Sequence, residues 1–291
     1  MTRYLSIVFL LAALFLAVVH ARTEKNEPPE PVGEELAENL EKLASRIPSG
    51  KFHVFVQQPF VVIGDEAQNV VEKRARGTVG WAVRLLKKAY FEKDPDEIIH
   101  IWLFRDKESY LKNAKELFGD EPGTPFGYYS ESDKALVMNI ATGGGTLVHE
   151  IVHPFVRANF ARCPTWFNEG LGSLYEQCGE REGKIVGYTN WRLAGLQEAI
   201  EEDALPSFEE LTSTTEWQFY HRDPGTNYAQ ARYLCYYLQE KGLLRSYYRQ
   251  FRASHEDDPT GLETLKSVLG TEDMQAFKRE WEKWVLGLSF P

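Results

Sequence analysis

The strongest constraint on the fold of this chain is the segment TLVHEIVH at residues 146–153. Its two histidines, His149 and His153, are four residues apart, and on an α-helix residues at that spacing lie on one face, one turn apart. Two neutral imidazoles placed in this way can bind one tetrahedral Zn²⁺ ion. Glu150 lies beside them and can reach a water on the metal without being a ligand, so we expect it to take the proton from that water. The alternative is a helix with two incidental histidines, but the apolar residues around them favour a buried, functional helix.

The third metal ligand is expected from the segment PTWFNEGLG at residues 164–172. A metzincin-type third histidine is excluded, because the position six residues beyond the second histidine holds Asn159. The segment opens with Pro and Thr, which favour the start of a helix, so Glu169 falls in the first turns of that helix and can face the metal. The alternative is a surface acid favoured by the helix dipole. The sequence therefore predicts one Zn²⁺ per chain, although Mn²⁺ or Co²⁺ could occupy the same ligands, held by His149, His153 and Glu169.

Together, TLVHEIVH and the following WFNEGLGSLYE resemble the peptidase MA-like family of gluzincins, strongly over residues 141–176 and more loosely over residues 126–238. The resemblance implies an α+β, zincin-like fold of the thermolysin type. In that fold, a mixed sheet and the active-site helix form the N-terminal lobe, and a mostly helical C-terminal lobe follows. It also implies zinc-dependent hydrolysis of peptide bonds with Glu150 as the general base. An edge strand near residues 135–140 is then expected to pair with extended substrate backbone.

Two positions depart from the pattern of that family. Pro154 directly follows His153. Inside a helix a proline removes one backbone hydrogen bond and costs about 3 kcal/mol, so the helix is expected to kink or end there. The position four residues after the glutamate ligand, often acidic in gluzincins, holds Ser173. Either Glu176 or Ser173 itself is then expected to orient a metal-binding histidine.

Hydrolysis also needs a hydrogen-bond donor for the developing oxyanion. A helix candidate at residues 227–240 carries four tyrosines, and the corresponding helix of peptidase MA-like proteins often opens with a tyrosine. The resemblance therefore favours Tyr228 as the catalytic donor, with His221 as the second candidate. The alternative is that all four tyrosines serve only in packing.

The chain is expected to consist of a polar leader with a short helix (22–50), an α/β lobe (51–160) and a helical lobe (161–291) that carries the third zinc ligand. Apolar alternation predicts one bent strand or two strands at 52–64, a strand at 98–104, and an antiparallel pair at 127–130 and 135–140. Helical spacing predicts helices at 34–47, 66–91, 107–118, 146–158, 166–177, 190–202, 226–241, 243–253, 260–269 and 272–287.

Residues 1–21 have the pattern of a secretory signal peptide. Arg3 precedes an apolar run at residues 4–19, and the small residues around His20 predict cleavage after Ala21. The run has 16 residues, whereas a membrane-spanning helix needs about 20. The mature protein is therefore expected to be secreted or periplasmic, with no stable membrane insertion after cleavage.

The charge of the chain limits its partners. A formal net charge of −10 repels phosphate backbones, so nucleic acid is not an expected partner, whereas a peptide or protein substrate is. Two alternatives to a peptidase remain open. One is a non-catalytic zinc-binding or scaffold protein, which would have no use for the carboxylate of Glu150. The other is a zinc amidase that acts on non-peptide or cell-wall amides.

Three cysteines are present, so at least one is free. A pair between Cys163 and Cys178 is disfavoured if a helix connects them, because twelve helical residues span about 18 Å and a disulfide needs Cα atoms within about 7 Å. A pair between Cys178 and Cys235 is the better candidate. Three buried thiols are the alternative.

Overall fold

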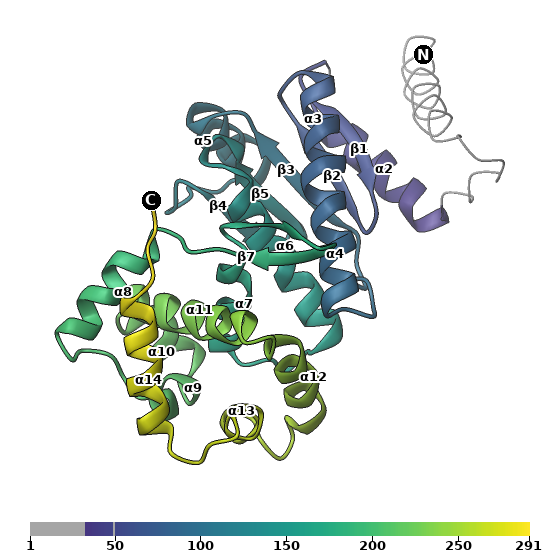
Figure 1. The fold of residues 1–291 in the computed structure, drawn as a ribbon. Coiled ribbons are helices and arrows are strands. Elements are labelled where there is room, and N and C mark those ends of the chain that lie inside the picture. Colours follow the sequence, from purple (N-terminus) through teal and green to yellow (C-terminus); the bar gives the residue numbers. More distant parts are fainter. Residues whose placement is uncertain (1–32, 49) are drawn as a thin grey trace, which may run out of the picture. The chain divides into compact units, whose positions relative to one another are not determined.

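The computed structural model describes residues 33–48 and 50–291 (Figure 1). It divides into two units, Met1–Ile47 and Pro48–Pro291. In the first unit the described chain forms helix α2 (Glu34–Arg46), which confirms the helix predicted at 34–47. The expected signal peptide lies outside the described residues. Within the described ranges, no helix is long and apolar enough to cross a membrane.

The second unit is built on a five-stranded mixed sheet with the order β1-β2-β3-β5-β4. The three central strands are parallel to one another, and the two outer strands run antiparallel to their neighbours. The α+β class with a mixed sheet is thereby confirmed. All four predicted strand regions are present, the first as two strands: β1 (His53–Gln57), β2 (Phe60–Gly64), β3 (Ile99–Phe104), β4 (Gly127–Ser130) and β5 (Ala135–Asn139).

The expectation that residues 135–140 form an edge strand is wrong. β5 lies between β3 and β4, and all five of its residues are buried, as is typical of an internal strand. The physical reason is that β5 uses one side for parallel pairing with β3 and the other for the antiparallel pairing with β4 that closes the local hairpin. The edge on this side of the sheet is therefore β4.

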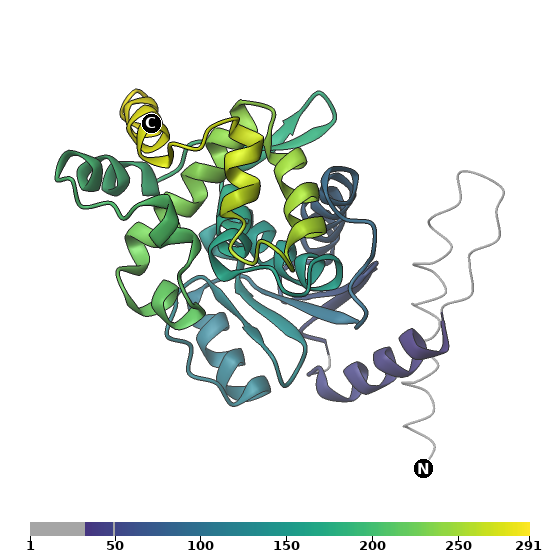
Figure 2. The same cartoon turned by 90° about the horizontal axis from the view of Figure 1, so that it is seen from below.

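Helices cover both faces of the sheet (Figures 1 and 2). On one face Trp102 and Phe104 of β3 contact aromatic side chains of the segment that contains α5 (Lys107–Asn113) and a π-helical turn, Ala114–Phe118. The opposite face carries α6 (Gly144–Asn159) and a long helical segment made of α3 (Gln68–Arg74), the π-helical turn Ala75–Gly80 and α4 (Trp81–Ala89). This segment corresponds to the helix predicted at 66–91, and it contacts α6.

A helical layer follows α6, and its central pair is α7 (Thr165–Leu174) packed against α11 (Pro224–Glu240). All six predicted C-terminal helices are present. They are α7, α11 and four others: α8 (Arg192–Glu201), α12 (Leu244–Ser254), α13 (Leu262–Leu269) and α14 (Met274–Leu286). Residues 48–291 form one compact unit. The division of this unit near residue 160 into an α/β lobe and a helical lobe stays a prediction.

The C-terminal part is less purely helical than the sequence predicts. α7 ends at Leu174, and a hairpin of β6 (Cys178–Arg181) and β7 (Lys184–Gly187) follows before α8 (Arg192–Glu201). Two short helices, α9 (Phe208–Thr212) and α10 (Glu216–His221), occupy a stretch for which no helix was predicted.

The candidate disulfide between Cys178 and Cys235 is not formed, and all three cysteines are free. Cys235 is buried in α11, whereas Cys178 opens the β6–β7 hairpin and is only half-buried, as is Cys163. The alternative of free thiols is therefore correct, although only one of them is fully buried.

Candidate metal centre

The metal centre depends on a close approach between α6 and the end of α7. Gly145 in the first turn of α6 lies against the backbone of Glu176, where a Cβ atom would stand 1.8 Å from the carbonyl oxygen. Gly172 of α7 lies against both imidazoles, and a Cβ atom there would stand 3.2 Å from atoms of His149 and of His153. Glycine at these two positions lets the two helices approach closely enough for their side chains to share one site.

α6 continues through Pro154 to Asn159, so the helix does not end at the proline. The carbonyl of Glu150 loses its helical donor there, but Pro154 itself is buried. At the end of the helix, the side-chain amide of Asn159 donates to the backbone carbonyl of Phe155 at 2.8 Å. Packing and this terminal hydrogen bond keep the helix intact past His153.

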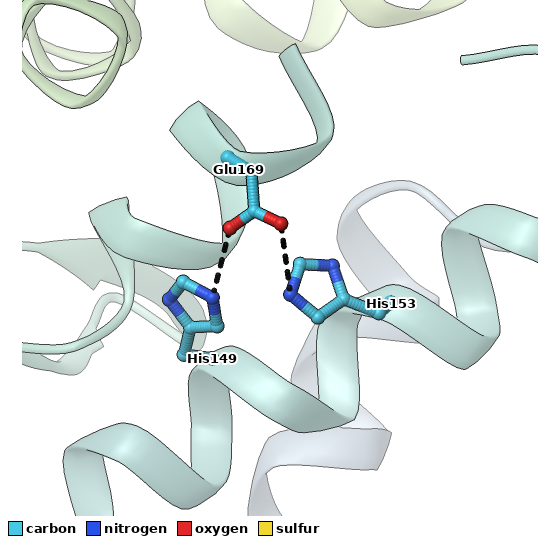
Figure 3. Close-up of side chains that lie close together, drawn as sticks. All are labelled: His149, His153 and Glu169. Carbon is cyan, nitrogen blue, oxygen red and sulfur yellow. Dashed lines mark ion pairs between the residues drawn. The ribbon is translucent and has the colours of Figure 1, made fainter. Parts of the chain in front are cut away.

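The three predicted ligands converge (Figure 3). One donor atom from each of His149, His153 and Glu169 lies within 4.8 Å of the other two. His149 Nε2 is 3.2 Å from one carboxylate oxygen of Glu169, and His153 Nε2 is 3.8 Å from the other. A tetrahedral zinc ion with bonds of about 2.0–2.1 Å holds its ligands roughly 3.3 Å apart, so small side-chain movements suffice. These three residues could hold a metal ion.

The chemistry of the centre also favours a cation. Glu169 is only 5% exposed, and its Oε2 atom is buried without a hydrogen-bond donor. Burial alone would raise the pKa of Glu169, but His153, His149 and a tyrosine hydroxyl together lower it to about 2. Burial would likewise lower the pKa of His149, but Glu169 and Glu176 outweigh it and raise the pKa to about 10. The carboxylate is thus held ionised, and a bound metal ion would replace the imidazolium proton.

Each imidazole is oriented through its second nitrogen. His153 Nδ1 donates to the side-chain oxygen of Asn168 at 3.0 Å. His149 Nδ1 lies 3.5 Å from Glu176 Oε1, a separation at which the attraction is chiefly that of an ion pair. Both contacts favour a proton on Nδ1, so Nε2, the atom that faces Glu169, is the one that can exchange its proton for a metal.

Glu176 is in turn fixed by a buried network. Arg192 donates to both of its carboxylate oxygens, at 2.9 and 2.7 Å, and the Asn190 amide donates to one of them at 2.9 Å. Although burial would raise the pKa of Glu176, Arg192 and His149 lower it to about 2. The hydroxyl of Ser173 has no hydrogen-bond partner among the described residues. Of the two residues that the sequence left open, Glu176 is therefore the one that orients His149.

Glu150 stands beside the centre without being one of its converging ligands. It follows His149 on α6 and is partly exposed. Its negative charge contributes to the raised pKa of His149 and to that of Tyr220. Glu150 thus neighbours a metal-binding histidine on α6 and remains partly accessible to solvent, as a proton acceptor must be.

Tyr220 is a site residue that the sequence reasoning missed. It lies on α10, and its hydroxyl donates to Glu169 Oε1 at 2.6 Å. Tyr228, the predicted donor, lies next to Tyr220, and the centroids of the two rings are 6.3 Å apart. The guanidinium carbon of Arg192 lies 4.9 Å from the centre of the Tyr228 ring. Burial and the charge of Glu169 raise the pKa of Tyr228, so its hydroxyl stays protonated and able to donate.

The second candidate for the oxyanion donor, His221, is not brought to the centre. Its side chain stacks on Trp217 with ring planes 10° apart, and its Nδ1 lies 2.9 Å from the Trp217 carbonyl. His221 is also exposed. The structure therefore places two tyrosines, and not this histidine, at the metal centre.

Comparison with known proteins does not assign a family. The sequence matches no family model, and no curated protein matches it.

The close contact at Gly172 gives a direct test of the geometry. Gly172→Ala is expected to lower zinc affinity roughly 10- to 100-fold, the effect typical of disturbing the residues that support metal ligands, because the new methyl group pushes both imidazoles. Gly195→Ala on α8 is the matched control, since a Cβ atom there meets nothing within 4 Å. Zinc affinity is measured by competition with a chromogenic chelator. Equal affinities for the two variants would contradict the described packing.

Proposed function

We propose that this protein is a secreted zinc-dependent metallopeptidase of the gluzincin type with a zincin-like fold. The observation that carries the proposal is a convergent donor set of two imidazoles and one carboxylate with Glu150 beside it. Catalytic zinc sites use three protein ligands and keep a fourth position open, whereas structural sites are closed by four. His149, His153 and Glu169 make up such a three-ligand set.

Zinc held by these residues would polarise the scissile carbonyl and make water easier to deprotonate. Glu150 accepts the proton from the attacking water and later donates it to the leaving amine. The hydroxyl of Tyr228 donates to the developing oxyanion. Asn168 and Glu176 hold the imidazoles so that this arrangement is formed before the substrate binds.

The substrate of this proposal is an extended peptide. β4 is the edge strand that lies next to β5, and α6 contacts β4. An extended peptide can add to a free edge through backbone hydrogen bonds. The strand expected for this role from the resemblance is therefore replaced by β4.

Two other functions are compatible with a metal centre of this kind. A non-catalytic zinc-binding protein would need no general base, and Glu150 counts against it. A zinc amidase acting on non-peptide or cell-wall amides would use the same residues. Incubation of the purified protein with casein, short peptides and cell-wall fragments, each with and without a chelator, separates the three. Chelator-sensitive cleavage of peptides supports the peptidase, and cleavage of cell-wall fragments alone would replace it with the amidase.

The two tyrosines are expected to have different roles. Tyr220→Phe removes the hydrogen bond to Glu169 and should weaken zinc binding roughly 10-fold. Tyr228→Phe removes the oxyanion donor and should lower kcat about 100-fold or more with zinc affinity unchanged. Kinetics at saturating zinc, together with zinc titrations, measure both effects. If Tyr220→Phe instead reduced kcat while Tyr228→Phe did not, the assignment of the oxyanion donor would pass to Tyr220.

A further inference from the structure

Arg157 extends the functional face of α6 beyond the metal ligands. It follows His153 by four residues and Glu150 by seven, spacings that place all three on one side of a helix. Its side chain is exposed, and its guanidinium carbon lies 5.2 Å from the centre of the Tyr129 ring. Tyr129 belongs to the edge strand β4, so Arg157 connects the metal-binding helix to the proposed substrate edge.

No described residue neutralises the charge of Arg157. The structure shows no hydrogen bond or ion pair between Arg157 and any described residue, whereas nearby Arg162 donates to Glu256 at 2.7 Å. A free guanidinium is a notable feature in a chain with a formal net charge of −10. A structural role also exists, because a cation in the last turn of a helix is stabilised by the helix dipole. That role requires only a positive charge, whereas recognition of a carboxylate favours the planar fork of arginine.

We propose that Arg157 is a specificity-determining residue that binds an acidic side chain of the peptide substrate. The inference rests on the proposed peptidase function and names the substrate class. Arginine binds carboxylates through two parallel N–H···O hydrogen bonds, and stacking on Tyr129 holds the guanidinium in place. The preferred substrate therefore carries Glu or Asp opposite the end of β4 where Tyr129 lies.

The position of the acidic residue follows from the helix and strand geometry. Arg157 lies seven residues after Glu150, a rise of about 10.5 Å along a helix, which corresponds to roughly three residues of an extended peptide. α6 begins shortly after β5 ends, and Phe155 near its other end contacts Phe60 at the start of β2. Because β2 and β5 run in the same direction and β4 runs opposite to them, α6 runs in the direction of β4. Antiparallel pairing is the commoner arrangement of neighbouring strands, and a substrate antiparallel to β4 runs the opposite way. Its acidic residue therefore lies about three residues on the N-terminal side of the scissile bond.

The test uses a set of otherwise identical fluorogenic peptides that carry Glu, Gln or Lys three residues before the scissile bond, and a fourth with Glu three residues after it. The wild-type protein is expected to cleave the first peptide with a kcat/KM about 10-fold above that for the Gln peptide, and the fourth without such a gain. Arg157→Gln should remove the gain, Arg157→Lys should keep only part of it, and Arg157→Glu should shift the preference to the Lys peptide. Arg162→Gln, an exposed and ion-paired control, should leave the preference unchanged.

Failure of this inference is distinguishable from failure of the proposed function. Equal kcat/KM for the Glu and Gln peptides in the wild-type protein would overturn the role of Arg157 while leaving the peptidase intact. If no peptide is cleaved, binding of the labelled Glu and Gln peptides to the wild-type protein and to Arg157→Gln, measured by fluorescence anisotropy, still decides the matter. If the wild-type protein binds the Glu peptide more tightly than the Gln peptide and Arg157→Gln does not, the role of Arg157 is supported. If the affinity changes neither with the peptide nor with the Arg157→Gln replacement, that role is overturned. Thermal unfolding of each variant confirms that it is folded.

Discussion

Replacing Glu150 by Gln is expected to abolish peptide hydrolysis while the metal stays bound. Glutamine has the shape of glutamate but cannot accept a proton, and loss of a general base typically costs about 10²- to 10⁴-fold in rate. Zinc content should not change, because the carboxylate of Glu150 is not among the converging ligands. The measurements are kcat on a fluorogenic peptide and zinc content by elemental analysis of the same sample.

The control for this variant is Glu256→Gln, which removes one carboxylate from an exposed ion pair far from the centre in sequence. It should retain both hydrolysis and zinc. Glu150 is partly exposed, so its replacement is not expected to affect folding. Substantial hydrolysis by Glu150→Gln would remove the general-base assignment and, with it, the mechanism proposed above.

The metal ligands could be predicted from the sequence because their geometry is local. His149 and His153 share one helix, so their spacing alone determines that they face the same way. Glu169 lies on the next helix, and its convergence with them depends on the short connection between α6 and α7. The residues that support the ligands were predicted only in part. Glu176 was one of two candidates, while Asn168, which orients His153, gave no signal of its own.

Tyr220 was missed because its position depends on tertiary packing. It lies on a helix of six residues, too short to show a clear hydrophobic period. The sequence did contain a signal for that helix, a capping box between Thr215 and Gln218, which marks a helix start independently of periodicity. Even with the helix predicted, nothing local indicates that its tyrosine reaches a carboxylate 51 residues earlier in the chain.

The error about the edge strand has a similar origin. The hairpin of β4 and β5 was correctly predicted, because a short turn joins neighbouring strands of suitable composition. Which of the two strands joins the rest of the sheet depends on pairing with β3, about thirty residues away in sequence. The run of four apolar residues that opens β5 was the one available indication, since strands buried on both faces lose the alternation of edge strands. This error matters for function, because it moves the proposed substrate edge to β4.

Glu169→Gln is expected to differ from Glu150→Gln in zinc binding, because it should lose the metal that Glu150→Gln retains. Both changes remove one negative charge from the same centre, but only Glu169 contributes a converging ligand. A neutral amide is a poor zinc ligand, so zinc affinity should fall by more than the 10- to 100-fold that is typical when a supporting residue is lost. If charge alone mattered, the two variants would lose zinc equally. Comparison of their zinc affinities therefore separates a ligand from a nearby charge.

The same variant makes a prediction for stability. A metal that binds only the folded state stabilises it by RT ln(1 + [L]/Kd), about 4 kcal/mol at a concentration 1,000 times Kd. For a chain of this size that corresponds to a rise in Tm of roughly 8–16 °C. Zinc should raise the Tm of the wild-type protein and of Glu150→Gln by such an amount, a chelator should reverse it, and Glu169→Gln should show little response. A similar zinc-dependent rise in Glu169→Gln would mean that the third ligand is another residue.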